Sequence, residues 1–234
     1  MSSDDSTSAT PRPDEVLFLP LGGTGEIGMN LTLYGHDGHW LAVDLGITFG
    51  GDDFPDYDVM MADPAFVAAR RERLAGIVLT HGHEDHVGAL PYLWPRLRCP
   101  VYATPFTAAL ARFKLQRAGL DDTTVIEIPL GGRFHCGPFE LEYIGMTHSI
   151  PEPNALLIRT AAGGVLHTGD WKLDPKPVVG RRYDEQRLRR LQREHLLAMV
   201  CDSTNAVVAG SSSSWAVVAA TAGSPPAMAP ASAR

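Results

Sequence analysis

The sequence predicts a mixed α/β sandwich. Short apolar runs typical of strands recur between residues 15 and 206, helical patterns separate several of them, and the first strands follow one another through turns. Of the 234 residues, 44% are apolar and 20% are charged, which is enough apolar side chain for a sizeable core. We therefore expect one folded unit over residues 15–206.

The expected elements alternate along this unit. Runs rich in Val, Ile and Leu predict ten strands, at residues 16–21, 30–34, 40–45, 76–80, 101–103, 124–128, 139–144, 155–160, 164–167 and 198–201. Helical spacing predicts four helices, at residues 64–73, 85–93, 104–118 and 184–194. Asp63 before Pro64 is a typical helix start, and Asp37-Gly38 predicts a hairpin turn between two strands.

The two ends of the chain differ in composition from this unit. Residues 1–14 are polar and acidic, and we expect a flexible leader there. Residues 207–234 contain nine Ala, six Ser and three Pro, with Arg234 as their single charged residue. Such a segment has little reason to form a core, so we expect a disordered tail over 207–234.

Composition also excludes several classes of protein. No apolar run approaches the ~18 residues that a membrane helix needs, and the polar first residues do not resemble a secretory signal. The sequence has three cysteines, Cys99, Cys136 and Cys201. Their odd number and the lack of C-x-x-C spacing favour a reducing cytoplasm. The net charge of −7 predicts no broad basic surface for nucleic acid.

A glycine motif at residues 23–28 matches the G-x-G-x-x-G pattern of dinucleotide-binding proteins. In those proteins a helix begins at the motif and its N-terminus holds the pyrophosphate. Here residues 29–34 alternate like a strand, and Gly35 leaves no room for a helix. The motif therefore predicts a turn between strands.

The most informative segment is the histidine motif, residues 81–86, with the sequence His-Gly-His-Glu-Asp-His after a buried-strand pattern. On extended chain His81 and His83 point the same way, whereas Asp85 and His86 turn away at the start of a helix. One segment can thus offer ligands to two adjacent metals. Imidazole with carboxylate suits zinc, with manganese as second choice.

This H-x-H-x-D-H pattern resembles the signature of the metallo-β-lactamase superfamily. Further residues match that family in order and at strand ends. His148 lies where the family has its next metal histidine, and Asp170 where it has the bridging aspartate. Asp44, in Asp44-Leu45-Gly46, resembles the aspartate that braces the metal loop. The resemblance implies an αββα sandwich, of which this chain would be the N-terminal portion.

Longer segments resemble ribonuclease J, a bacterial family of β-CASP metallo-β-lactamase nucleases. The resemblance covers residues 16–206 and is carried by five segments: residues 21–30, 80–91, 148–151, 167–172 and 201–206. It implies two zinc ions, RNA as substrate, 5′-exonuclease and endonuclease activity, and a cytoplasmic setting. Its first metal set would be His81, His83 and His148, and its second Asp85 and His86, with Asp170 between them. Asp202 matches an acidic residue that acts beside the metals.

The sequence departs from this family after Ala206, where the family continues into its cap domain. That later part supplies the last histidine of the second metal and the pocket for the RNA 5′ end, so we expect an incomplete second site. We hypothesise a truncated or frameshifted chain with impaired activity, and homo-oligomers only as a property of the longer family members. A short protein with an intended tail remains the alternative.

Two other function classes stay open at the level of sequence. The same metal motif occurs in small-substrate hydrolases of the glyoxalase II or lactonase kind, which a thioesterase assay would distinguish. The chain could also be an inactive fragment, which unfolding with and without zinc would test.

Overall fold

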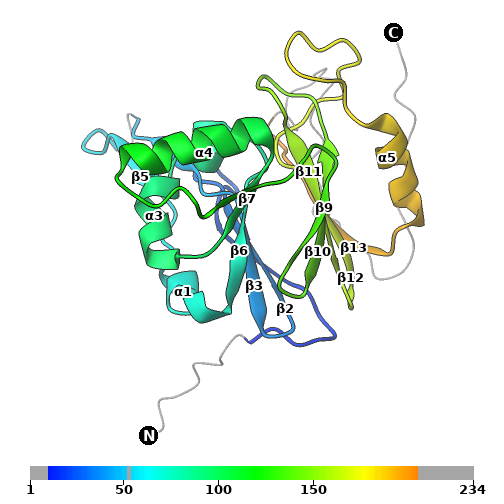
Figure 1. Cartoon of the computed structure of the whole chain (residues 1–234), viewed down its shortest axis with the longest axis horizontal. Coiled ribbons are helices and arrows are strands. Elements are labelled where there is room, and N and C mark those ends of the chain that lie inside the picture. Colours follow the sequence, from blue (N-terminus) through cyan, green and yellow to red (C-terminus); the bar gives the residue numbers. More distant parts are fainter. Residues whose placement is uncertain (1–9, 52–53, 205–234) are drawn as a thin grey trace, which may run out of the picture.

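The computed structural model describes residues 10–51 and 54–204, and two facing sheets form its centre (Figure 1). In Figure 1 the sheets are seen nearly edge-on, with α1, α3 and α4 beyond one sheet and α5 beyond the other. This four-layer αββα arrangement confirms the expected fold class.

The first sheet has the strand order β1-β2-β3-β6-β7-β8. Its strands are β1 (Leu17–Gly22), β2 (Leu31–His36), β3 (His39–Val43), β6 (Leu74–Val78), β7 (Val101–Ala103) and β8 (Val125–Glu127). β1, β2 and β3 pair antiparallel, as expected for strands joined by short turns, and Asp37 and Gly38 have the positive φ of the predicted hairpin. β3, β6, β7 and β8 pair parallel, because longer crossover connections separate them.

The second sheet has the order β13-β12-β11-β10-β9. Its strands are β9 (Arg133–Cys136), β10 (Phe139–Gly145), β11 (Asn154–Thr160), β12 (Gly163–His167) and β13 (Leu196–Val200). All pairings are antiparallel except β12 with β13, which follows the crossover through α5. A small separate hairpin joins β4 (Ile47–Phe49) to β5 (Val59–Met61).

The helices are shorter than the sequence predicts. They are α1 (Ala65–Ala68), α2 (Glu84–Val87), α3 (Leu90–Leu97), α4 (Pro105–Arg117) and α5 (Glu185–Arg190), with 3-10 turns at Arg71–Arg73 and Leu191–Arg193. The helix expected at residues 85–93 is divided into α2 and α3. Pro91 lies in the first turn of α3, where its missing N–H costs nothing, so a new helix begins there.

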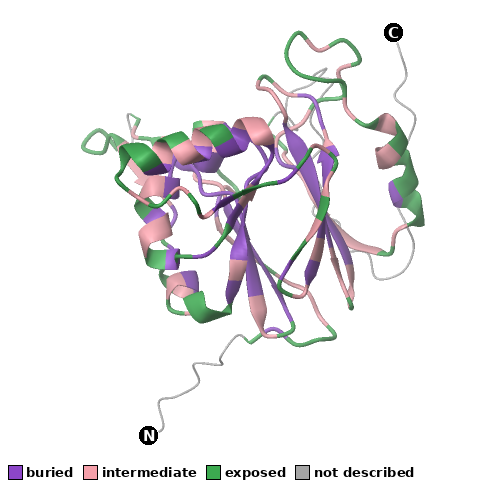
Figure 2. Ribbon diagram, in the orientation of Figure 1, coloured by how far each residue is buried: buried purple, intermediate pink, exposed green. Residues whose placement is uncertain are grey.

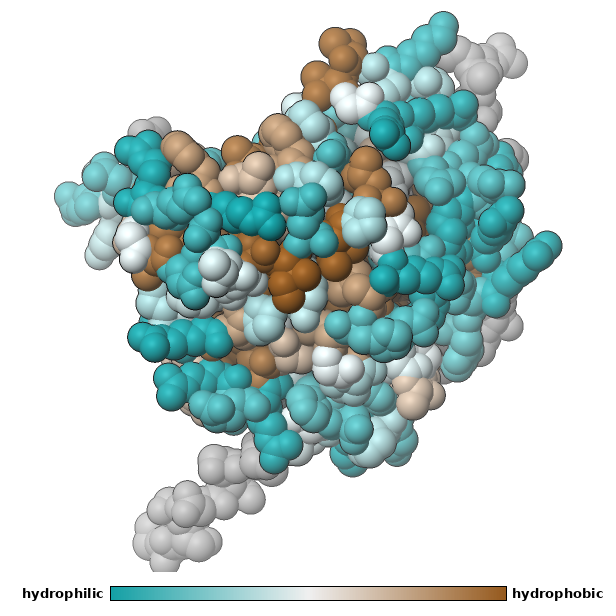
Figure 3. Space-filling view, in the orientation of Figure 1, coloured by the Kyte–Doolittle hydropathy of each residue, from teal (hydrophilic) through white to brown (hydrophobic). Residues whose placement is uncertain are grey.

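Three apolar clusters hold the layers together, and the most buried segments are the central strands (Figure 2). One lies between the first sheet and helices α1, α3 and α4, and one fills the space between the sheets. The third lies between the second sheet and the segment of α5 and its following turn, where Leu191 is buried. On the face drawn in Figure 3 most residues are hydrophilic, and hydrophobic ones gather near its middle.

Polar bonds also cross between the two sheets. Tyr143 of β10 donates its hydroxyl hydrogen towards the carbonyl oxygens of Leu79 (2.9 Å) and Tyr102 (3.1 Å) of the first sheet. The Tyr34 hydroxyl lies 2.9 Å from Nδ1 of His167 on β12. Because these groups are buried, each bond fixes how one sheet sits on the other.

The expected leader overlaps the described residues only from residue 10 onwards. There the carbonyls of Pro11 and Arg12 accept hydrogen bonds from Gly38 and Asp37 of the β2–β3 turn. The packed chain therefore begins earlier than the predicted boundary at residue 15. The tail expected at 207–234 lies outside the described residues. In the part of the chain that is described, the helices are too short or too polar to cross a membrane.

Candidate metal centre

The histidine motif lies at the end of β6, where extended chain turns into α2. His83 is still extended (φ −69°, ψ 153°), and Glu84 begins the helix. His81 and His83 therefore precede the helix, whereas Asp85 and His86 lie in its single turn. This change of backbone separates the two pairs of side chains, as the sequence predicts.

The second sheet brings two further ligands to the same place. His148 lies in the connection from β10 to β11, and Asp170 follows β12. Lys172 and Thr147 form an antiparallel bridge, in which the Lys172 N–H donates to the Thr147 carbonyl at 2.7 Å. This bridge joins the two connections and explains why residues 22 positions apart meet.

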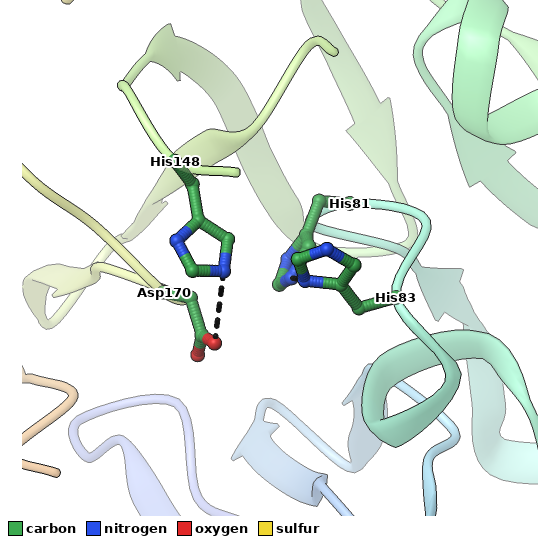
Figure 4. A group of neighbouring side chains, drawn as sticks. All are labelled: His81, His83, His148 and Asp170. Atoms are coloured by element: carbon green, nitrogen blue, oxygen red, sulfur yellow. Dashed lines mark hydrogen bonds and ion pairs between the residues drawn. The ribbon is translucent and has the colours of Figure 1, made fainter. Parts of the chain in front are cut away.

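The side chains form two groups that share Asp170. The first group contains His81, His83, His148 and Asp170, and the second contains Asp85, His86 and Asp170. Within each group, one potential ligand atom per residue lies within 4.8 Å of every other. In Figure 4 the His148 and Asp170 side chains approach the His81 and His83 rings from the opposite side.

The separations between these atoms fit metal ligands. His81 Nε2 lies 3.1 Å from His83 Nδ1, and His148 Nε2 lies 3.4 Å from Asp170 Oδ2. In the second group His86 Nε2 lies 3.4 Å from Asp85 Oδ2 and 3.2 Å from Asp170 Oδ1. Zinc bonds of 2.0–2.1 Å in a tetrahedron put neighbouring ligand atoms about 3.3–3.4 Å apart. Both groups therefore suit a divalent ion.

A buried carboxylate orients two of the histidines. Asp44, only 1% exposed, accepts hydrogen bonds from the Thr80 N–H (2.8 Å), the Thr80 hydroxyl (2.9 Å) and His86 Nδ1 (2.7 Å). The Thr80 hydroxyl in turn lies 3.0 Å from Nδ1 of His81. With both Nδ1 atoms engaged, the Nε2 atoms of His81 and His86 face the centre, which is the arrangement typical of histidine ligands.

Burial and neighbouring charges shift the pKa values of the side chains in the centre. Burial and the neighbouring imidazole of His86 lower the pKa of His81, and burial and His148 lower the pKa of His83. Both imidazoles are therefore neutral near pH 7, as metal ligands must be. Burial alone would raise the pKa of Asp170, but hydrogen bonds from His148 and His86 outweigh it and hold that pKa far below its ordinary value.

Of the eight residues that we expect in the site, six lie in the two groups. Asp44 lies directly behind them, in contact with His86. Asp202, which follows β13, belongs to neither group. Its N–H donates to the Thr168 hydroxyl at 3.1 Å, and its Oδ1 accepts from the N–H and hydroxyl of Thr204. Asp202 is thus linked through Thr168 to the connection that carries Asp170.

Sequence reasoning missed two polar residues of the centre. Thr80 carries the link from Asp44 to His81, and its position directly before the histidine motif could have suggested this. Asn30, two residues after the glycine motif, lies with Nδ2 3.2 Å from His86 Nε2. One ligand side chain is less well held, because the buried Nδ1 of His148 has no hydrogen-bond partner among the described residues.

The fold and these two groups define a family. Residues 25–198 match the model of the metallo-β-lactamase superfamily, and the chain belongs to that superfamily. Among curated proteins it is similar to the ribonuclease J of Sinorhizobium meliloti, with 51% identity over 208 residues, 86% of this chain and 36% of the relative. It is 40% identical over 191 residues to ribonuclease J of Mycobacterium tuberculosis, with 81% of this chain and 34% of the relative covered.

The chain thus spans about a third of the length of these curated relatives. Solved structures support the fold alone. A protein of unknown function from Enterococcus faecalis has a TM-score of 0.58 at 16% identity, covering 86% of this chain and 53% of that one. A metallo-β-lactamase fold protein of Bacillus subtilis, YhfI, has a TM-score of 0.50 at 17% identity, covering 68% of this chain and 64% of that one.

Proposed function

We propose that this centre serves the metal-dependent hydrolysis of RNA phosphodiester bonds, by the 5′-exonuclease and endonuclease reactions of the ribonuclease J type. The observation that carries this proposal is the shared Asp170, whose two oxygens lie beside different histidines, His148 and His86. Two ions held by these neighbouring groups would suit a displacement at phosphorus. The similarity to ribonucleases J supports RNA as the substrate class.

Two zinc ions are the proposed cofactors, with manganese as the alternative. The first group offers three imidazoles and a carboxylate, a donor set typical of zinc. The second offers one imidazole and two carboxylates, one of them shared, so its ion is expected to bind more weakly. When bound, the ions would supply a nucleophile at neutral pH and neutralise charge on the phosphoryl group.

The protein residues have three roles in this proposal. Asp44 and Thr80 hold the imidazoles of His81 and His86 with Nε2 towards the centre. Asp170 holds the two groups in register by contacting both. Asp202, which the Thr168 hydroxyl connects to the Asp170 segment, is proposed to act as the acidic residue near the leaving group.

The remaining expectations concern the setting of the protein. We propose RNA as the partner, the cytoplasm as the location and no membrane association. The net charge of −7 provides few free cations to neutralise phosphates, so the chain by itself is expected to bind RNA weakly. The cleavage rate is therefore expected to be low but dependent on the metal centre.

An assay with 5′-monophosphorylated RNA and added zinc or manganese tests this function. The unaltered chain is compared with the double variant Asp85→Ala, His86→Ala and with His135→Ala, which changes an exposed histidine. We expect slow cleavage by the unaltered chain and by His135→Ala, and none by the double variant. Cleavage that survives in the double variant, or thioester hydrolysis faster than RNA cleavage, would contradict the proposal.

A further inference from the structure

The glycine motif at residues 23–28 is followed by a strand and not by a helix, and the segment that it begins reaches the metal centre at Asn30. It forms the turn between β1 and β2, and Asn30 is the last residue before β2. The Asn30 N–H and its side-chain Nδ2 both donate to the Asp85 carbonyl, at 3.1 and 2.9 Å. One residue of this turn thus fixes the backbone that carries two ligands of the second group.

Two glycines make this contact possible by close approach. A Cβ on Gly23, which has φ +80°, would lie 2.2 Å from Asn30 Oδ1. A Cβ on Gly46 would lie 1.6 Å from the same Asp85 carbonyl oxygen that Asn30 binds. Larger side chains at either position would displace Asn30 or Asp85, so the glycines here serve the fit around Asn30.

The orientation of the Asn30 amide follows from its partner. A carbonyl oxygen accepts hydrogen bonds only, so the NH₂ end must face Asp85. That group has a second hydrogen, and Nδ2 lies 3.2 Å from His86 Nε2, the atom on which Asp85 and Asp170 also converge. A neutral donor therefore stands among the potential ligand atoms of the second group.

An amide N–H cannot bind a cation, but it can donate to an oxygen beside one. We propose that Asn30 has two tasks in the second group: it positions Asp85 and His86, and it donates its second N–H to an anionic oxygen bound there. This inference rests on the proposed function for the identity of that oxygen, which would belong to a phosphate group. Donors aimed at phosphate oxygens are a common element of phosphoryl-transfer sites.

The test uses two readouts on the full chain. Titration with Co²⁺, followed by visible absorption, measures the affinity of each metal group, and inorganic phosphate is then titrated into the Co²⁺-loaded chain. Asn30→Ala is expected to weaken the second ion about tenfold, the effect of losing a residue that orients ligands, and to leave the first within about threefold. Phosphate affinity is expected to fall about tenfold or more, the effect of one lost charge-assisted hydrogen bond.

Asn30→Asp separates this role from general damage to the fold. The Asn30→Asp chain is expected to bind the second ion more tightly than the Asn30→Ala chain does. It is expected to bind phosphate more weakly than that chain, because the new carboxylate adds negative charge and the N–H donor is lost. A merely structural role would move both affinities in one direction. Ile27→Ala is the matched control, since Ile27 lies in the same turn with its residue 74% exposed, and should change neither affinity.

Several outcomes would overturn the proposal. The first is that Asn30→Ala binds the second ion and phosphate within twofold of the unaltered chain. The second is that Asn30→Asp changes its affinities for the ion and for phosphate in the same direction. The third is that the unaltered chain binds no second ion at millimolar Co²⁺. Failure of the proposed function would look different. In that case RNA would not be cleaved, while Asn30→Ala still weakened the binding of both the second ion and phosphate. Compared with Asn30→Ala, Asn30→Asp would still bind the ion more tightly and phosphate more weakly.

Discussion

The two halves of the metal centre are built in different ways. The half on the first sheet is one continuous motif, in which His81 and His86 are at most 2% exposed and Asp44 orients both. The half on the second sheet comes from two separate connections, and the side chains of His148 and Asp170 are 17% and 28% exposed. The first half is thus fixed by contacts within the first sheet and its connections, whereas the second depends on how the two sheets pack.

Removal of Asp44 is the strongest test of the half on the first sheet. Asp44→Ala leaves the Thr80 N–H and His86 Nδ1 without their buried acceptor, and should lower the free energy of unfolding by about 3–5 kcal/mol. Asp44→Asn keeps an acceptor, and Asn tolerates the left-handed backbone at this position (φ 63°). This variant should therefore lower the free energy of unfolding by less. Chemical denaturation of the metal-free chain measures both, and a loss below about 1 kcal/mol in Asp44→Ala would refute this account.

The two metal groups should respond separately to loss of one ligand each. His83→Ala removes an imidazole from the first group and is expected to abolish tight metal retention. Asp85→Ala changes only the second group and is expected to leave the tightly bound ion in place. Metal content after dialysis against a mild chelator compares them, with His135→Ala as control. Equal losses in both ligand variants would show that the groups are not distinct.

Acid should loosen the half on the second sheet through Glu142 of β10. Burial alone raises the pKa of Glu142, but hydrogen bonds from Arg187 and Arg159 outweigh it and lower that pKa to about 2. The ionised Glu142 therefore stabilises the fold fully at pH values above the ordinary pKa of a glutamate. This stabilisation is lost as the pH falls towards the lowered pKa of Glu142. Because Arg187 belongs to α5, protonation of Glu142 is expected to weaken the contact between this helix and the sheet.

For the unaltered chain this linkage predicts a loss of up to about 3 kcal/mol between pH ~5 and ~2. In Glu142→Gln that part of the pH dependence should disappear. Hydrogen exchange in β10 and α5 at both pH values measures it, with β2 and β3 as an internal reference. The same acid-induced increase in exchange in the variant would exclude Glu142 as the cause.

Substitution of Glu152 should have the smallest effect, which it would exert through the position of His148. It lies in the connection after His148 with φ 56°, and its carboxylate accepts the Phe106 N–H of α4 at 2.8 Å. Glu152→Ala removes this helix cap and should cost about 1 kcal/mol and less than tenfold in affinity for the first ion. Glu152→Gln keeps an acceptor and should behave like the unaltered chain. Equal losses in the two variants would exclude the cap as the cause.

The same contrast explains what the sequence could predict. Residues 81–86 are adjacent, so their chemistry is visible in one segment, and every expected strand is present in the structure. His148 and Asp170 are far apart in sequence, and only the resemblance to a family joined them to the motif. The sequence does not predict the strands at 47–49, 59–61 and 133–136. They are only three or four residues long, and the first two pair only with each other, in the small hairpin.

The roles of Thr80 and Asn30 could not be predicted for another reason. Each acts through a hydrogen bond to a residue or carbonyl that the fold brings near, and such bonds leave no spacing pattern in the sequence. The glycines around Asn30 were visible, but their purpose depends on the close approach of Asp85. Tertiary contact, not local preference, decides what these residues do.

The central claim is that the chain builds one strong and one weak metal group that share Asp170. The most direct test is the metal content of the purified full chain, loaded with zinc and dialysed against a mild chelator. We predict about one ion per chain after dialysis, because three imidazoles with water nearly complete a zinc coordination sphere. Two retained ions would show that the second group is complete, and the absence of any retained ion would contradict the centre itself.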